Sequence, residues 1–90
     1  MMEPVPVKHR RKIPKPFVIT DLHKNIASVV IKHPNIGEYD INLELYGDTG
    51  NFWTLLEVTI QTWRLVSRGY LDRGVRANSR TMELFDQVIA

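Results

Sequence analysis

The sequence predicts an α+β fold, with a short antiparallel sheet of three strands followed by two helices and preceded by an extended basic arm. The first half of the chain holds short apolar runs rich in β-branched residues, which are typical of strands. The second half shows apolar residues at helical spacing. Strands followed by helices indicate the α+β class. The alternative is a four-stranded meander plus one C-terminal helix.

The arm is predicted at residues 1–16, which hold four of the five prolines of the chain. Proline fixes φ and has no amide donor, so this stretch should be extended and form no ladder of its own. Residues 17–90 are predicted to form a single small domain, since ninety residues suffice for one modest core.

Three strands are predicted from local composition. Residues 17–20 and 27–31 are short apolar runs bounded by polar residues. Residues 33–37 then provide turn chemistry with proline, asparagine and glycine. Residues 39–46 alternate strictly between apolar and other side chains, which indicates a strand with one buried face. The apolar set there is Tyr39, Ile41, Leu43 and Leu45.

Residues 51–68 fit either a helix or a strand, and we favour the helix because both of its ends carry caps. Asp48 or Asn51 can cap the start, and Gly69 can follow the last turn. In this helix the expected core side is Phe52, Trp53, Leu55, Leu56, Ile60, Trp63 and Val66. Val58 and Leu65 lie outside that arc and could form a second contact strip. The strand alternative rests on the alternation at residues 56–61.

The rest of the chain is predicted as a loop or short helical turn at residues 69–78 and a final helix. That helix should begin near Ser79, whose hydroxyl can cap it. Met82, Phe85 and Val88 or Ile89 would share one side of it.

The tripeptide Asp48-Thr49-Gly50 and the chain length resemble the subunit of retroviral aspartic proteases. The resemblance ends there, because Gly47 replaces the apolar residue expected before the aspartate and Asn51 follows where a small residue is expected. The later apolar element of that family is also missing. We therefore interpret the tripeptide as a turn and helix cap.

No other pattern predicts catalysis or a cofactor. His9, His23 and His33 do not share a ligand spacing, and the chain has no cysteine. Glycine patterns for phosphate or dinucleotide binding are missing as well. We expect neither an enzyme nor a bound metal or cofactor, and no small-molecule substrate is evident.

Charge is segregated along the chain, and its blocks are the candidate binding residues. The basic arm contains Lys8, Arg10, Arg11, Lys12 and Lys15. A second block contains only arginines, namely Arg64, Arg68, Arg73, Arg76 and Arg80. The predicted acidic face contains Glu38, Asp40, Glu44, Asp48 and Glu57. Arginine pairs bidentately with phosphate and carboxylate, and one copy's acidic face could meet another copy's basic block.

These observations predict a non-catalytic binding or assembly protein, with a viral or phage-like accessory or structural role as one example. Its partner would be another protein or its own copies, held through the arm and the arginine block. The alternative is a small nucleic-acid-binding protein that places the same residues on the phosphate backbone. The arm could also be a targeting signal or a solvated tail. Without an apolar run long enough for a membrane span or secretory signal, we expect a soluble intracellular protein in the cytoplasm or nucleus of a host cell.

Overall fold

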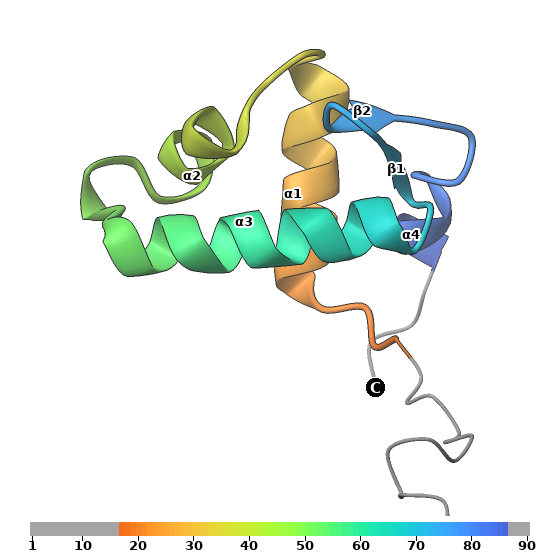
Figure 1. The fold of residues 1–90 in the computed structure, drawn as a ribbon, viewed down its shortest axis with the longest axis horizontal. Coiled ribbons are helices and arrows are strands. Elements are labelled where there is room, and N and C mark those ends of the chain that lie inside the picture. Colours follow the sequence, from red (N-terminus) through yellow and green to blue (C-terminus); the bar gives the residue numbers. More distant parts are fainter. Residues whose placement is uncertain (1–16, 87–90) are drawn as a thin grey trace, which may run out of the picture.

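The computed structural model describes residues 17–86, which form a mostly helical fold. The elements are α1 (Asp21–Lys32), α2 (Glu38–Tyr46), the 3-10 helix η2 (Gly47–Thr49), α3 (Phe52–Ser67), β1 (Leu71–Asp72), β2 (Arg76–Ala77) and α4 (Glu83–Asp86). Helix α1 runs across α3, with α2 near one end of α3 and the hairpin and α4 near the other (Figure 1).

The predicted α+β fold is wrong, and so is the four-stranded alternative. Residues 27–31 lie in α1 and residues 39–46 lie in α2, while residues 17–20 form neither a helix nor a strand. The only sheet in residues 17–86 is the two-stranded hairpin of β1 and β2. Short apolar runs suit a buried helix segment as well as a strand, and here tertiary packing selects the helix.

Helix α1 begins at a capping box that the sequence analysis did not identify. The Thr20 side chain accepts from the backbone amide of His23, and the His23 ring accepts from the backbone amide of Thr20. From this start Ile26, Ala27 and Val30 recur at helical spacing and are buried. The β-branched run that suggested a strand therefore forms the core side of a helix.

Helix α3 confirms the helical interpretation of residues 51–68, and its caps are those of the sequence. Asn51 Oδ1 accepts from the amides of Trp53 at 2.8 Å and Thr54 at 3.0 Å. At the other end Gly69 has φ 82°, and the amide of Tyr70 donates to the carbonyl of Leu65 at 2.9 Å. This is the Schellman arrangement, in which a glycine takes the left-handed position after the helix.

The hairpin that follows α3 returns the chain to the core. Leu71 pairs with Ala77 and Asp72 with Arg76 in an antiparallel register. Val75 in the connecting turn has φ 58°, which strains a β-branched residue, yet its side chain is buried. Burial of that side chain offsets the strain, and the hairpin closes one end of the molecule.

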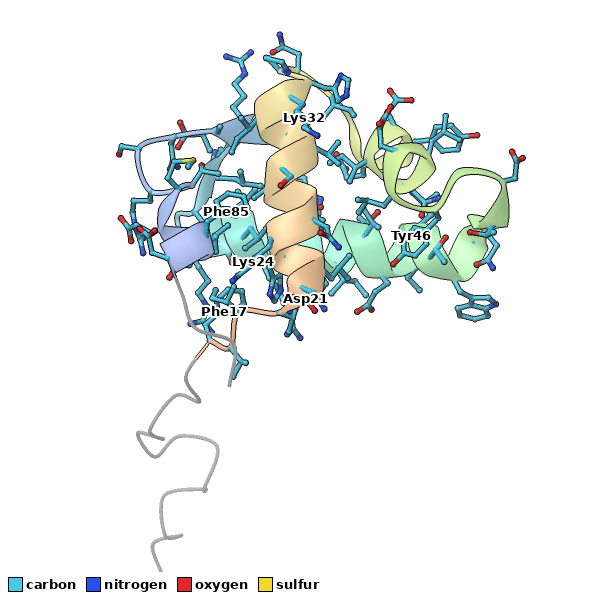
Figure 2. The ribbon with its side chains drawn as sticks, turned by 180° about the vertical axis from the view of Figure 1, so that it is seen from behind. Phe17, Asp21, Lys24, Lys32, Tyr46 and Phe85 are labelled. Carbon is cyan, nitrogen blue, oxygen red and sulfur yellow. The ribbon has the colours of Figure 1, made fainter. Side chains whose placement is uncertain are left out.

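The core lies where α1 crosses α3. All described elements except η2 and β2 contribute a fully or almost fully buried apolar side chain. These include Ile26 and Val30 of α1, Ile41 of α2, Val58 and Leu65 of α3, Leu71 of β1, and Leu84 of α4. Figure 2 shows the molecule from behind, where α1 covers the middle of α3.

Candidate functional site

The most prominent surface of the described residues is an apolar strip on α3. We define the α3 strip as Phe52, Trp53, Leu56, Ile60 and Trp63, whose exposed fractions are 67%, 72%, 40%, 42% and 45%. Two tryptophans and a phenylalanine are large groups to leave in water, because a buried aromatic side chain removes about 150–250 Å² of surface. Contiguous exposed apolar patches mark interaction surfaces more often than scattered single residues do.

The strip is exposed because α3 buries its other side. Val58, Thr62 and Leu65 are fully buried, and they recur at spacings of four and three residues. The assignment of the two sides of α3 was therefore wrong in the sequence analysis. Five of the seven residues expected in the core form the α3 strip, whereas Val66 packs against the core and Leu55 is partly buried. Val58 and Leu65, expected to form a second contact strip, belong to the core.

Polar residues border the strip on one side. Glu57, Gln61 and Arg64 lie on α3, and Arg68 is its C-cap residue. These four residues line a hollow of about 470 Å³ together with Phe17, Val18, Thr20, Leu22 and His23. Figure 2 shows Phe17 and Asp21 near the start of α1, where the chain enters this region. The border thus carries charges of both signs beside the apolar strip.

Within this hollow a hydrogen-bond chain joins α1 to α3. The backbone amide of Thr20 donates to His23 Nδ1 at 2.9 Å, so the proton of the neutral ring is on Nε2. Nε2 then donates to Gln61 Oε1 at 2.8 Å, and Gln61 Nε2 donates to Glu57 Oε1 at 3.2 Å. His23 is 3% exposed, and both of its ring nitrogens have hydrogen-bond partners. It is therefore a buried core residue whose polar atoms are paired.

The environment of His23 favours its neutral form. Burial lowers the pKa of His23, and the charge of Arg64 acts in the same direction. The hydrogen bond to Gln61 and the charge of Glu57 oppose that change of pKa. Protonation of the ring would also add a proton to Nδ1, which already accepts a hydrogen bond from the backbone amide of Thr20.

A second hollow lies where the C-terminal end of α3 meets the hairpin. It has a volume of about 620 Å³ and is lined by Trp63, Val66, Ser67, Gly69, Leu71, Asp72 and Arg73. Trp63 therefore belongs both to the α3 strip and to the wall of this hollow.

All five arginines of the block are exposed, but Arg68 and Arg80 also contact aromatic rings. The Arg68 guanidinium lies 4.8 Å from the centre of the Phe17 ring, and that of Arg80 lies 4.5 Å from the centre of the Tyr70 ring. Arg80 also donates to the carbonyl of Arg68 at 2.9 Å and pairs with Glu83. Arg64, on α3, and Arg73 and Arg76, on the hairpin, are exposed. The basic arm lies outside the described residues.

The predicted acidic face is concentrated on α2 and η2. Glu38, Asp40 and Glu44 belong to α2 and Asp48 to η2. Glu44 lies 3.8 Å from His33 Nε2. Glu57 instead lies on α3, beside Arg64 in the hollow described above.

Asp48 and Thr49 of the tripeptide that resembles a protease motif lie in η2, ahead of α3. Asp48 is exposed in η2, and the cap of α3 is Asn51. No group of three potential metal ligands occurs among the described residues. Within the same residues, no helix is long and apolar enough to cross a membrane.

Sequence reasoning found α3 but missed the α3 strip. The signal that could have revealed it is the spacing of Trp53, Leu56, Ile60 and Trp63, which alternates three and four residues as in a coiled-coil seam. Comparison with protein-family models, with curated proteins and with solved structures finds no match for this chain, so its function has to be inferred from its own surface.

Proposed function

We propose that this chain is a non-catalytic binding or assembly protein that contacts another protein surface through the α3 strip. The single observation that carries this proposal is the exposure of five large apolar side chains on one side of one helix. Burying them against a partner removes apolar area from water at about 25 cal/mol per Å². The proposal includes an intracellular location. A viral or phage-like accessory or structural protein is one example of the proposed role.

The composition of the strip fits protein recognition. Interface centres are enriched in tryptophan, tyrosine and arginine and are bordered by polar residues. The α3 strip has two tryptophans at its ends and Glu57, Arg64 and Arg68 along its border. Exposed Tyr39 and Leu43 on α2 extend the apolar surface, since they line a hollow together with Phe52.

The test compares the native chain with Ile60→Lys/Trp63→Lys, both carrying a tag, on gel filtration of extracts from the cells that produce the protein naturally. We expect the native chain to elute in a species larger than the monomer and the double variant to elute as a monomer. Met82→Lys is the matched control, because Met82 is exposed but lies on α4's side of the molecule, in a hollow with Ser28, Ile31 and Lys32. Monomeric elution of the native chain would contradict the proposal.

Nucleic-acid binding is the second candidate, favoured by the two exposed hairpin arginines. The side chains of Arg73 and Arg76 make no hydrogen bond or ion pair with other residues of the range 17–86, and the arm carries five more basic residues. Helix α3 itself is a poor fit for this role. It follows α2 after a short turn, as a recognition helix would, but it presents tryptophans, leucine, isoleucine and Glu57 where phosphate contacts need positive charge.

Two measurements separate the candidates. Nuclease treatment of the extract should leave the large species intact if the partner is a protein and dissolve it if the partner is a nucleic acid. Fluorescence anisotropy with a labelled short RNA and DNA should show binding that falls steeply with salt only in the second case. There, a chain starting at Phe17 and the variant Arg73→Ser/Arg76→Ser should both bind more weakly.

A further inference from the structure

We infer that the α3 strip pairs with the α3 strip of a second copy, with the two helices antiparallel. This inference rests on the proposed function and names the partner. Its first support is the spacing of the strip, because Trp53, Leu56, Ile60, Trp63 and then Ser67 follow one another at intervals of three, four, three and four residues. A seam with that period keeps two helices in contact along their length when they wind slightly around each other.

The size of the strip is sufficient for a dimer. With about 150–250 Å² for a fully exposed aromatic side chain, the exposed fractions of the five residues correspond to on the order of 500 Å² per copy. Two copies would bury about 1,000 Å², which is about the smallest area expected of a biological interface. The strip includes both tryptophans of the chain, and tryptophan is enriched among the residues that dominate binding energy.

The charges beside the seam select the antiparallel direction. In heptad terms Trp53 and Ile60 are at position a and Leu56 and Trp63 at position d, which puts Glu57 and Arg64 at successive e positions. Parallel helices would bring Glu57 and Arg64 against the neutral g residues Phe52 and Thr59. Antiparallel helices bring e against e, so Glu57 of each copy meets Arg64 of the other.

The same register pairs the apolar residues. If Glu57 lies opposite Arg64 of the second copy, Ile60 lies opposite Trp63 of the second copy, and Leu56 lies opposite its Ser67. Two-fold symmetry then repeats each contact in reverse, as in an isologous interface. Ser67 is small and exposed, so it leaves room for the larger Leu56.

The hollow at the hairpin end of α3 receives the ends of the strip. In this register Phe52 and Trp53 extend past the last turn of the second copy's α3, toward its Gly69 and Arg73. That is where the hollow of about 620 Å³ lies, walled by Trp63, Ser67 and Arg73. Trp53 is the most exposed residue of the strip, and Arg73 has the planar cation that packs well on an aromatic face.

The first test is the mass of the purified full chain by analytical ultracentrifugation across concentration. We expect a monomer–dimer equilibrium that Trp53→Ser and Ile60→Lys both shift to monomer. A native chain that stays monomeric up to about 1 mM would overturn the inference, while a large nuclease-resistant species in extracts would leave the proposed function standing.

A charge exchange tests the direction of the helices. Glu57→Arg alone and Arg64→Glu alone each place like charges together twice per dimer, and should weaken the dimer about tenfold. Glu57→Arg combined with Arg64→Glu restores both pairs and should return the affinity to near the native value. Equal dimer affinity of the native chain, the two single variants and the combined variant would overturn the antiparallel pairing. A combined variant that dimerises more weakly than both single variants would also overturn it. Circular dichroism verifies that each variant is folded.

Because the chain has no cysteine, disulfide trapping gives an independent result. A mixture of Leu56→Cys chains and Ser67→Cys chains should form a mixed disulfide under mild oxidation, while neither chain alone should form one. A disulfide between two Ser67→Cys chains would instead indicate parallel helices or another interface and would overturn the inference.

Discussion

At the scale of single residues, buried hydroxyl groups show what polar atoms contribute to this fold. Thr62 and Thr81 are both buried, but their surroundings differ. Thr81 Oγ1 donates to the carbonyl of Tyr70 at 2.7 Å and accepts from the amide of Asn78 at 2.8 Å. Thr62 Oγ1 has no hydrogen-bond partner within the described part of the chain.

We therefore expect opposite effects from the same substitution at these two positions. Thr62→Val should raise the free energy of unfolding by about 1 kcal/mol, because it removes an unsatisfied buried hydroxyl without changing shape. Thr81→Val should lower it by about 1–3 kcal/mol, because a carbonyl and an amide lose their partner. Urea denaturation measures both changes. Equal losses of stability would show that the Thr62 hydroxyl does have a partner.

His23 should make stability depend on pH below neutrality. Its pKa in the folded protein is lowered from the usual value of about 6.5, chiefly by burial. The unfolded chain therefore binds more protons at His23 than the folded chain does. The stability from neutral His23 is complete above about pH 6.5 and is lost as the pH falls through the lowered pKa.

The measurement is the free energy of unfolding at pH 7.5 and at lower pH for the native chain and for His23→Asn. The variant should be less stable at pH 7.5, since the bond to Gln61 is lost, and should lose less stability between pH 7 and pH 5. All other side chains are the same in the two chains, so the difference between the two curves isolates His23. Parallel curves would contradict this role.

At the scale of elements, the N-terminal cap of α3 can be separated from the tripeptide that precedes it. Asn51→Ala removes the acceptor for the amides of Trp53 and Thr54 and should cost about 1 kcal/mol of stability. Asp48→Ala, in the exposed η2 turn, is the matched control and should cost a few tenths of a kcal/mol at most. Thermal unfolding compares the two, and a larger loss from Asp48→Ala would contradict the assignment of the cap.

Substitutions on the two sides of α3 should change different properties. Those on the buried side should lower the stability of the monomer, and those on the exposed side should weaken self-association. Leu65→Ala creates a cavity in the core and should lower the free energy of unfolding by about 2–5 kcal/mol. Trp63→Ala removes a larger side chain from the exposed side and should change the stability of the monomer by less than about 1 kcal/mol, while it weakens self-association. Denaturation at low concentration and sedimentation at high concentration give the two readouts. A severe loss of monomer stability from Trp63→Ala would place Trp63 in the core.

At the scale of the whole molecule, the crossing of α1 over α3 determines which surface faces outward. Helix α1 covers the side of α3 that bears Val58 and Leu65, and the hairpin and α4 close one end with Leu71 and Leu84. The described residues provide no second layer for the opposite side of α3. Because α3 is apolar on both sides and α1 covers only one of them, we expect the other side to contact a partner surface.

By itself, the sequence determined the features that depend on neighbouring residues. The bounds of α3 followed from Asn51 and Gly69, because capping satisfies amides and carbonyls within one turn. The turn at residues 33–37 and the segregation of charge were also evident from composition alone.

Only the tertiary structure decided between helix and strand for residues 27–31 and 39–46. In α2, Ile41 and Leu45 satisfy both the alternation of a strand and the four-residue spacing of a helix. The two sides of α3 likewise both have apolar residues at helical intervals. Which side is buried depends on the position of α1, and that contact joins residues too far apart in the sequence for any local pattern to encode. The exposed strip, and with it the proposed function, is therefore a consequence of the packing of α1 on α3.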